Sequence, residues 1–180
     1  MRVIAGKAKG IRLESPKGRG VRPTLDRVRE SLFSILGPRL ADARFLDLFA
    51  GTGANGIEAL SRGAVHATFV DNDRRSQELV RRNLGRAGLS DSADCRCLRL
   101  PNALASLSPC EPYDIIFADP PYAFEEFDAL LGALQEGRLL AEDGIVVVEH
   151  ARGAAVPEQT AGLCRQREAV YGDTRLSFFT

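Results

Sequence analysis

From residue 45 to residue 148, short apolar segments alternate with segments suited to helices, and this alternation limits the possible folds more than any other feature. Strands are predicted over residues 45–49, 67–70, 96–100, 113–118 and 145–148, and most of these segments are apolar enough to be buried. The remaining periodic segments predict helices over residues 24–36, 55–62, 74–87 and 126–135. Repeated alternation of this kind predicts an α/β fold, in which helices cover both faces of a mostly parallel sheet.

The two ends of the chain depart from this alternation. Residues 169–171 and 175–179 flank Gly172-Asp173 and predict an antiparallel C-terminal hairpin. Residues 2–22 contain two short apolar stretches separated by glycine, which predict a small N-terminal β-hairpin and a connector. Thr24 is a typical N-cap residue for the first helix. We therefore expect an N-terminal hairpin over residues 1–22 and a main domain over residues 23–180.

Composition excludes several classes of protein. The chain has 180 residues, of which 44% are hydrophobic and 27% charged, as in an ordinary globular domain. It shows neither the apolar run of a membrane span nor the start of a signal peptide, so we expect a cytoplasmic protein without membrane contact. The two histidines and four cysteines lack metal-site spacing, so we expect no metal. Nothing in the sequence demands more than a monomer.

The net charge is zero, but the charges are strongly segregated along the chain. Residues 1–30 carry nine basic and three acidic side chains, whereas residues 111–149 carry ten acidic side chains against one arginine. A glycine-rich basic segment at the N-terminus predicts contact with the phosphates of a nucleic acid. The basic residues predicted to contact a nucleic acid are Arg2, Lys7, Lys9, Arg12, Lys17, Arg19 and Arg22.

A glycine-rich turn follows the first predicted strand. Residues 46–56 read Leu-Asp-Leu-Phe-Ala-Gly-Thr-Gly-Ala-Asn-Gly, and Asp71 ends the next strand twenty residues beyond Gly51. Glycines let the backbone approach a ligand at a helix N-terminus, and an acid at that spacing can accept ribose hydroxyls. The pattern predicts a nucleoside site and fits NAD as well as S-adenosylmethionine. Asp47 favours S-adenosylmethionine, because it would repel a pyrophosphate but attract an ammonium group.

The tetrapeptide Asp119-Pro120-Pro121-Tyr122 follows the strand predicted over residues 113–118. If the Asp119 carboxylate and the Pro120 carbonyl each accept one N–H of an exocyclic amine, its nitrogen lone pair can face an incoming methyl group. The two prolines remove backbone donors, so only acceptors face the amine. The Tyr122 ring can stack on a flipped base. These residues are the candidate catalytic set.

With these motifs, the chain resembles the RsmD family of bacterial 16S rRNA guanine-N2 methyltransferases over nearly its whole length. The glycine turn and Asp-Pro-Pro-Tyr occur in many methyltransferases. The family-specific segments are Arg-Pro-Thr-Leu-Asp-Arg-Val-Arg-Glu-Ser-Leu-Phe at residues 22–33 and Tyr-Gly-Asp-Thr at residues 171–174. The resemblance implies a Rossmann-like class I fold, S-adenosylmethionine as cofactor, and methylation of guanine N2, at position 966 of 16S rRNA, during 30S subunit assembly.

Carried over by position, the resemblance implies that Asp119, Pro120 and Tyr122 orient the guanine amine, and that Asn102 and Ala103 flank the adenine of the cofactor. The complete set of predicted cofactor-binding residues is Thr24, Asp47, Ala50, Gly51, Thr52, Gly53, Asp71, Asn72, Asn102 and Ala103.

Two further hypotheses remain open on the sequence. The same site could methylate another amine, either adenine N6 or the side-chain amide of a protein glutamine. DNA enzymes of this type normally carry an added recognition domain, and amide methyltransferases generally have asparagine before the two prolines. Alternatively, the chain could be a noncatalytic assembly factor that uses its basic segment only to bind RNA. Labelled methyl groups trapped in RNA or in protein would separate these functions.

Overall fold

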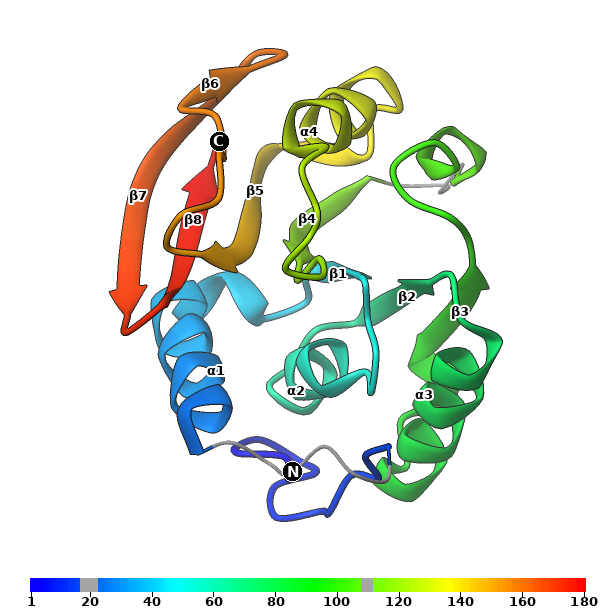
Figure 1. Cartoon of the computed structure of the whole chain (residues 1–180). Coiled ribbons are helices and arrows are strands. Elements are labelled where there is room, and N and C mark those ends of the chain that lie inside the picture. Colours follow the sequence, from blue (N-terminus) through cyan, green and yellow to red (C-terminus); the bar gives the residue numbers. More distant parts are fainter. Residues whose placement is uncertain (17–22, 108–111) are drawn as a thin grey trace.

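The computed structural model describes residues 1–16, 23–107 and 112–180 and shows one eight-stranded sheet between two helical layers (Figure 1). The strand order is β3-β2-β1-β4-β5-β8-β7-β6, and the first five strands in that order run parallel. The strands are β1 (Arg44–Leu48), β2 (His66–Asp71), β3 (Ala93–Cys97), β4 (Tyr113–Ala118), β5 (Leu140–Ala151), β6 (Gln159–Thr160), β7 (Leu163–Tyr171) and β8 (Thr174–Phe179). The predicted α/β class with a C-terminal antiparallel hairpin is confirmed.

Helices cover both faces of the sheet, as the alternation predicts. The helices α1 (Pro23–Leu36), α2 (Ala54–Ser61) and α3 (Arg74–Ala87) form one layer, and α4 (Phe127–Glu136) lies on the other face (Figure 1). Side chains alternate between the two faces along each strand, so Phe45 packs beneath α1 and α2, whereas Leu46 and Leu48 pack beneath α4. Among the described residues, no helix is long and apolar enough to cross a membrane.

Several predicted boundaries are wrong for physical reasons. The strand β5 spans Leu140–Ala151 instead of residues 145–148, because its first half includes the exposed Glu142 and Asp143. The helix α1 already begins at Pro23, so Thr24 lies in its first turn and is not the N-cap. The strand β3 spans Ala93–Cys97 instead of residues 96–100, because it is an edge strand with mostly exposed side chains and a weak apolar signal. The strand β7 extends back to Leu163 through exposed polar residues, which local composition does not reveal as strand.

The N-terminal segment, residues 1–16, lies across the outer side of the layer formed by α1, α2 and α3 (Figure 1). A single antiparallel bridge joins Arg2 and Arg12, so the predicted hairpin is only one bridge long. The fully buried Glu58 of α2 accepts hydrogen bonds from the backbone N–H groups of Ile4 and Ala5, at 2.7 and 3.0 Å. The segment is therefore fixed to the helical layer by hydrogen bonds to a buried carboxylate.

Candidate active site

The site lies where the strand order reverses direction, at the carboxyl ends of β1 and β4. Connections from β1 lead outward to β2 and β3, whereas β4 and β5 lie on its other side. Ligands of open α/β sheets bind in the crevice at such a switch point. Both sequence motifs are located here, since the glycine turn follows β1 and Asp119 follows β4.

The three glycines at and after the turn that follows β1 are required by different structural constraints. Gly51 and Gly53 have φ angles of 54° and 76°, in the left-handed region that favours glycine, and Gly53 is the N-cap of α2. A Cβ atom on Gly56 would lie 2.3 Å from the ring of Phe69. The first two glycines thus shape the turn, whereas Gly56 allows α2 to pack closely on the sheet.

Asp71 at the end of β2 organises the same turn. Its Oδ2 accepts a hydrogen bond from the backbone N–H of Gly51, and its Oδ1 accepts one from the backbone N–H of Asp73, both at 2.9 Å. Each carboxylate oxygen accepts two hydrogen bonds when fully used, so both retain acceptor capacity. Asp71 can therefore hold the turn and still accept ribose hydroxyls, as the spacing predicts.

Asp47 is buried beneath the turn. Its Oδ2 accepts a hydrogen bond from the backbone N–H of Gly56 at 2.9 Å. Desolvation by burial raises the pKa of Asp47 to about 8, and the charges of Asp119 and Asp71 add to this increase. Without a cationic ligand, Asp47 is mostly protonated at neutral pH and fixes the start of α2.

Asp119 is joined directly to the turn after β1. Its backbone N–H donates to the carbonyl of Leu48 at 3.3 Å. The loop then turns back, with the N–H of Phe124 donating to the Pro121 carbonyl at 2.8 Å, and Phe124 packs edge-on against Phe49, with 5.3 Å between ring centroids. The two motifs therefore form one packed unit at the rim of the sheet.

Phe49 and Phe124 are missed by the motif analysis, although Phe49 lies inside the glycine-rich segment. Phe49 has a φ angle of 59°, which is uncommon for a residue that is not glycine. Strained backbone of this kind persists where surrounding structure holds it and is frequent at functional sites. Here the packing of the Phe124 ring provides that support.

A third missed residue, Glu149, lies in β5 next to Asp119. The sheet register places Phe69 of β2, Phe117 of β4 and Val147 of β5 at one level, with their side chains on the α2 side.

Each of these residues is followed two positions later by an acid, namely Asp71, Asp119 and Glu149. Since side chains alternate along a strand, the three acids lie in one row on the same side of the sheet. The signal was present in the sequence, because Glu149 directly follows the predicted strand over residues 145–148, as Asp119 follows its own.

Burial raises the pKa values of Asp119 and Glu149. Desolvation raises the pKa of Glu149 to about 8, and the nearby charge of Asp119 adds to the effect. Asp119 is accessible at the rim, yet the surrounding protein displaces water from its carboxyl and raises its pKa to about 6. At neutral pH Asp119 is thus mostly an ionised acceptor, whereas Glu149 is mostly neutral. The row offers acceptors and negative charge to a cationic ligand.

The remaining predicted site residues lie on more than one face of the sheet. Tyr122 is 87% exposed, so its ring is free to stack on a base, whereas Pro120 is buried. Asn102 lies on the α4 side, in a cavity of about 400 Å³ also lined by Ala105 and by Ala129 and Ala133 of α4. Ala103 is half-buried directly after it, and Asn72 is exposed directly after Asp71.

The basic residues predicted to bind RNA are only partly described. Arg2, Lys7, Lys9 and Arg12 are exposed on the N-terminal segment. Lys17, Arg19 and Arg22 lie outside the described residues, as does the side chain of Thr24.

The N-terminal segment also contacts the glycine turn through Asn83 of α3. The Asn83 side chain accepts from the backbone N–H of Glu14 at 2.7 Å and donates to the carbonyl of Thr52 at 2.9 Å. Asn83 is fully buried, so these hydrogen bonds are shielded from water. One buried amide thus joins the predicted RNA-binding segment to the turn predicted to bind the cofactor.

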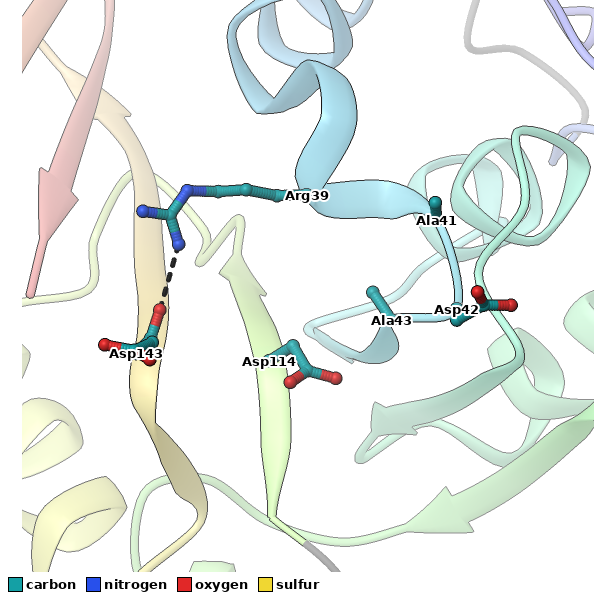
Figure 2. A pocket seen from close by; sticks show the side chains of 6 residues that line it. All are labelled: Arg39, Ala41, Asp42, Ala43, Asp114 and Asp143. Atoms are coloured by element: carbon teal, nitrogen blue, oxygen red, sulfur yellow. Dashed lines mark hydrogen bonds between the residues drawn. The ribbon is translucent and has the colours of Figure 1, made fainter.

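A second cavity, of about 250 Å³, lies near the amino ends of β1 and β4 (Figure 2). Arg39 spans part of it by donating to the backbone carbonyl of Asp143 at 2.9 Å, and Asp42 and Asp114 also line it. Asp114 accepts a hydrogen bond from the backbone N–H of Arg44, which immediately precedes the buried part of β1. This end of the sheet is opposite the one at which α/β sheets bind ligands, so it is not part of the candidate site.

The fold matches that of a solved structure described as a methyltransferase. The Escherichia coli protein described as "Putative methyltransferase yhhF" superposes with a TM-score of 0.85 at 34% identity, covering 99% of this chain and 96% of that one. Together with this similarity, the alternating α/β sheet with a glycine turn after β1 identifies the chain as a class I methyltransferase. The methyl donor of this class is S-adenosylmethionine.

The sequence profile of the family described as "Conserved hypothetical protein 95" matches residues 1–180, and this chain belongs to that family. "Putative rRNA methyltransferase YlbH" of Bacillus subtilis is 41% identical over 180 residues, which cover 99% of this chain and 98% of that protein. "Ribosomal RNA small subunit methyltransferase D" of Escherichia coli is 36% identical over 173 residues, covering 96% of this chain and 85% of that protein. The resemblance to the RsmD family is thereby confirmed.

Proposed function

We propose that this protein transfers a methyl group from S-adenosylmethionine to the exocyclic N2 of a guanine in small-subunit rRNA. The observation that carries the proposal is the junction of the two motifs. The Asp119 backbone donates to Leu48, and the Asp119 carboxylate interacts electrostatically with Asp47 beneath the glycine turn. A methyl donor bound at that turn and an amine bound at Asp119 would therefore be neighbours.

The residues of the site fit the cofactor. Gly51 and Gly53 leave two positions of the turn without a side chain, and Asp71 retains acceptor capacity for ribose hydroxyls. The acidic row formed by Asp71, Asp119 and Glu149 suits a sulfonium and an ammonium group. When bound, the cofactor supplies an electrophilic methyl group: the C–N bond forms as the C–S bond breaks, and the amine then loses a proton. Asp119 stands where it can accept that proton.

The charge of Asp119 favours guanine over adenine. A carboxylate is an acceptor only, and it can accept two parallel N–H groups. In guanine the ring nitrogen beside the exocyclic amine carries a hydrogen, so both N1–H and N2–H can donate to Asp119. In adenine that ring nitrogen has a lone pair, which an ionised carboxylate repels. Asparagine, which can also donate, would suit adenine better.

The choice of small-subunit rRNA follows the family. The named relative from Escherichia coli is a small-subunit rRNA methyltransferase. Exposed basic residues on the N-terminal segment supply the positive charge that phosphate contacts require. By the same analogy we propose guanine 966 as the target and an assembling 30S subunit as the substrate, acted on by a cytoplasmic monomer without a metal.

The proposal is tested with labelled S-adenosylmethionine and unmethylated small-subunit rRNA, followed by mass spectrometry of the digested nucleosides. We expect the wild-type protein to form N2-methylguanosine. Asp119→Ala should lower the transfer rate by at least about a hundredfold, since positioning and proton acceptance are lost. Cofactor binding, measured by calorimetry, should change by no more than a few-fold, because the turn after β1 is untouched.

A matched control is Asp128→Ala, which removes an exposed carboxylate from the first turn of α4. This variant should transfer methyl groups at the wild-type rate. Formation of N6-methyladenosine or methylated glutamine would replace the proposed substrate, and the absence of any label in RNA or protein would support the noncatalytic hypothesis.

A further inference from the structure

The outer face of α3 carries an unusual concentration of arginine. This helix of 14 residues contains five arginines, no lysine and a single acidic residue, Glu78. Its arginines are exposed on the surface and are Arg74, Arg75, Arg81, Arg82 and Arg86. A helix face that is merely solvated usually mixes charges, because opposite charges at i,i+4 stabilise it. We call these five residues the α3 arginine face.

The arginines form a stripe along the helix. Arg74 and Arg81 are seven residues apart, as are Arg75 and Arg82, so each pair lies on nearly the same side of the helix. The buried residues of α3, such as Val80, face the core instead. The stripe from residue 74 to residue 86 is about 18 Å long, at 1.5 Å per residue.

The N-terminal end of the stripe adjoins the acidic row of the active site. The helix α3 begins directly after its N-cap Asp73, whose backbone N–H donates to Asp71 at 2.9 Å. Arg74 and Arg75 therefore stand next to the segment that is predicted to hold the ribose.

The other end of the stripe adjoins the N-terminal segment. Glu14 forms ion pairs with Arg82 at 3.0 Å and with Arg86 at 2.6 Å. These two arginines hold the pKa of Glu14 below its usual value, mainly through the hydrogen bond from Arg82. The two ion pairs neutralise Glu14. Because Glu14 is the only acidic residue among residues 1–16, the surface remains basic.

Three arginines keep their charge available. Among residues 1–16, 23–107 and 112–180, no carboxylate forms an ion pair with Arg74, Arg75 or Arg81. A guanidinium presents several N–H donors in a planar fork that matches a phosphate group.

We propose that the α3 arginine face is a second RNA-binding surface, which holds the phosphate backbone of the rRNA between the N-terminal segment and the active site. It extends the predicted RNA contacts beyond residues 1–22 and rests on the proposed function. Phosphate contacts position the substrate without reading its sequence, so this surface sets the affinity and orientation of the RNA rather than the choice of base.

The test is the triple variant R74Q/R75Q/R81Q, which removes three charges without breaking an ion pair. Its affinity for a fluorescent in vitro transcript of small-subunit rRNA is measured by anisotropy between about 50 and 200 mM salt. We expect binding at the higher salt to weaken at least about tenfold, and the slope of log K against log salt to fall by about two. Cofactor affinity and melting temperature should stay at their wild-type values.

The matched control is R39Q/R138Q/R152Q, which removes three exposed arginines located outside α3. It should bind RNA within about twofold of the wild type, with an unchanged salt slope. Glu14→Gln, which removes an acidic side chain from the surface, should tighten RNA binding severalfold.

The two proposals fail separately. If the triple variant binds the transcript as tightly as its control, the α3 surface is overturned even when N2-methylguanosine is formed. If the wild type labels no guanine but the triple variant still weakens RNA binding, the proposed function fails and the α3 surface stands.

Discussion

At the scale of single residues, the site gives different pKa values to carboxyl groups that are chemically alike. Asp47 and Glu149 have pKa values raised to about 8, whereas that of Asp119 is raised only to about 6. Desolvation is the main cause in all three, and it is weakest in effect for the residue at the open rim. At neutral pH one carboxyl thus remains an ionised acceptor while two neighbours are mostly neutral. This avoids three adjacent negative charges.

The decrease of kcat/KM at acidic pH tests whether Asp119 is the ionised acceptor. We expect kcat/KM for methyl transfer to rise with pH through about 6, because Asp119 must lose its proton to accept an N–H. Glu149→Gln should keep this decrease, since Glu149 is already neutral in that range. If the decrease disappears in Glu149→Gln but persists in Asp119→Asn, Glu149 is the titrating acceptor.

At the scale of elements, the contact between α2 and β2 determines how closely the turn after β1 approaches the sheet. Gly56 in the first turn of α2 lies against the ring of Phe69 in β2, where a Cβ atom would be only 2.3 Å away. The ring is fully buried and cannot move without displacing its neighbours. The close approach of helix and strand therefore depends on this one missing side chain.

Gly56→Ala should destabilise the protein by about 1–3 kcal/mol through overpacking. The same change at Gly85, in α3, meets no atom within 4 Å and should stabilise by up to about 1 kcal/mol through helix propensity. Urea denaturation measures both free energies of unfolding. Equal effects of the two substitutions would show that Phe69 yields to the added methyl group.

At the scale of the whole molecule, charge is distributed by surface. The N-terminal segment and α3 form a basic side, while the carboxyl ends of the strands carry the acidic row. A polyanionic substrate and a cationic cofactor are thus attracted to adjacent regions of one small domain. Buried Asp47 lies beneath the acidic region. Because burial disfavours its charged form, Asp47 makes the folding stability of the whole protein depend on pH.

Folding stability should fall as pH rises from about 4 to about 8. In this range Asp47 is ionised in the unfolded chain but protonated in the folded one, so unfolding releases a proton and a higher pH favours it. Glu149 acts in the same direction. In Asp47→Asn this dependence of the melting temperature on pH should be clearly weaker. A melting temperature of the wild type that is constant over this range would contradict a raised pKa of Asp47.

Local patterns were sufficient for much of the fold. The bounds of α3, Arg74–Ala87, and of β4, Tyr113–Ala118, follow from neighbouring residues alone. Caps mark the helix, and a run that is apolar apart from Asp114 marks the strand. The switch-point location of Asp119 also follows from the alternation, since parallel strands end at the same edge of a sheet.

Other features depend on segments that are far apart in the chain. The sequence determined the order of strands and helices and the two motifs, because propensity and periodicity act over a few residues. Tertiary structure decided that β5 pairs with β4, which brings Glu149 beside Asp119, and that Glu58 fixes Ile4 and Ala5. It also decided that Asn83 joins Glu14 to the glycine turn. Such contacts arise from packing between distant elements, which sets both the burial and the pKa values of the groups it brings together.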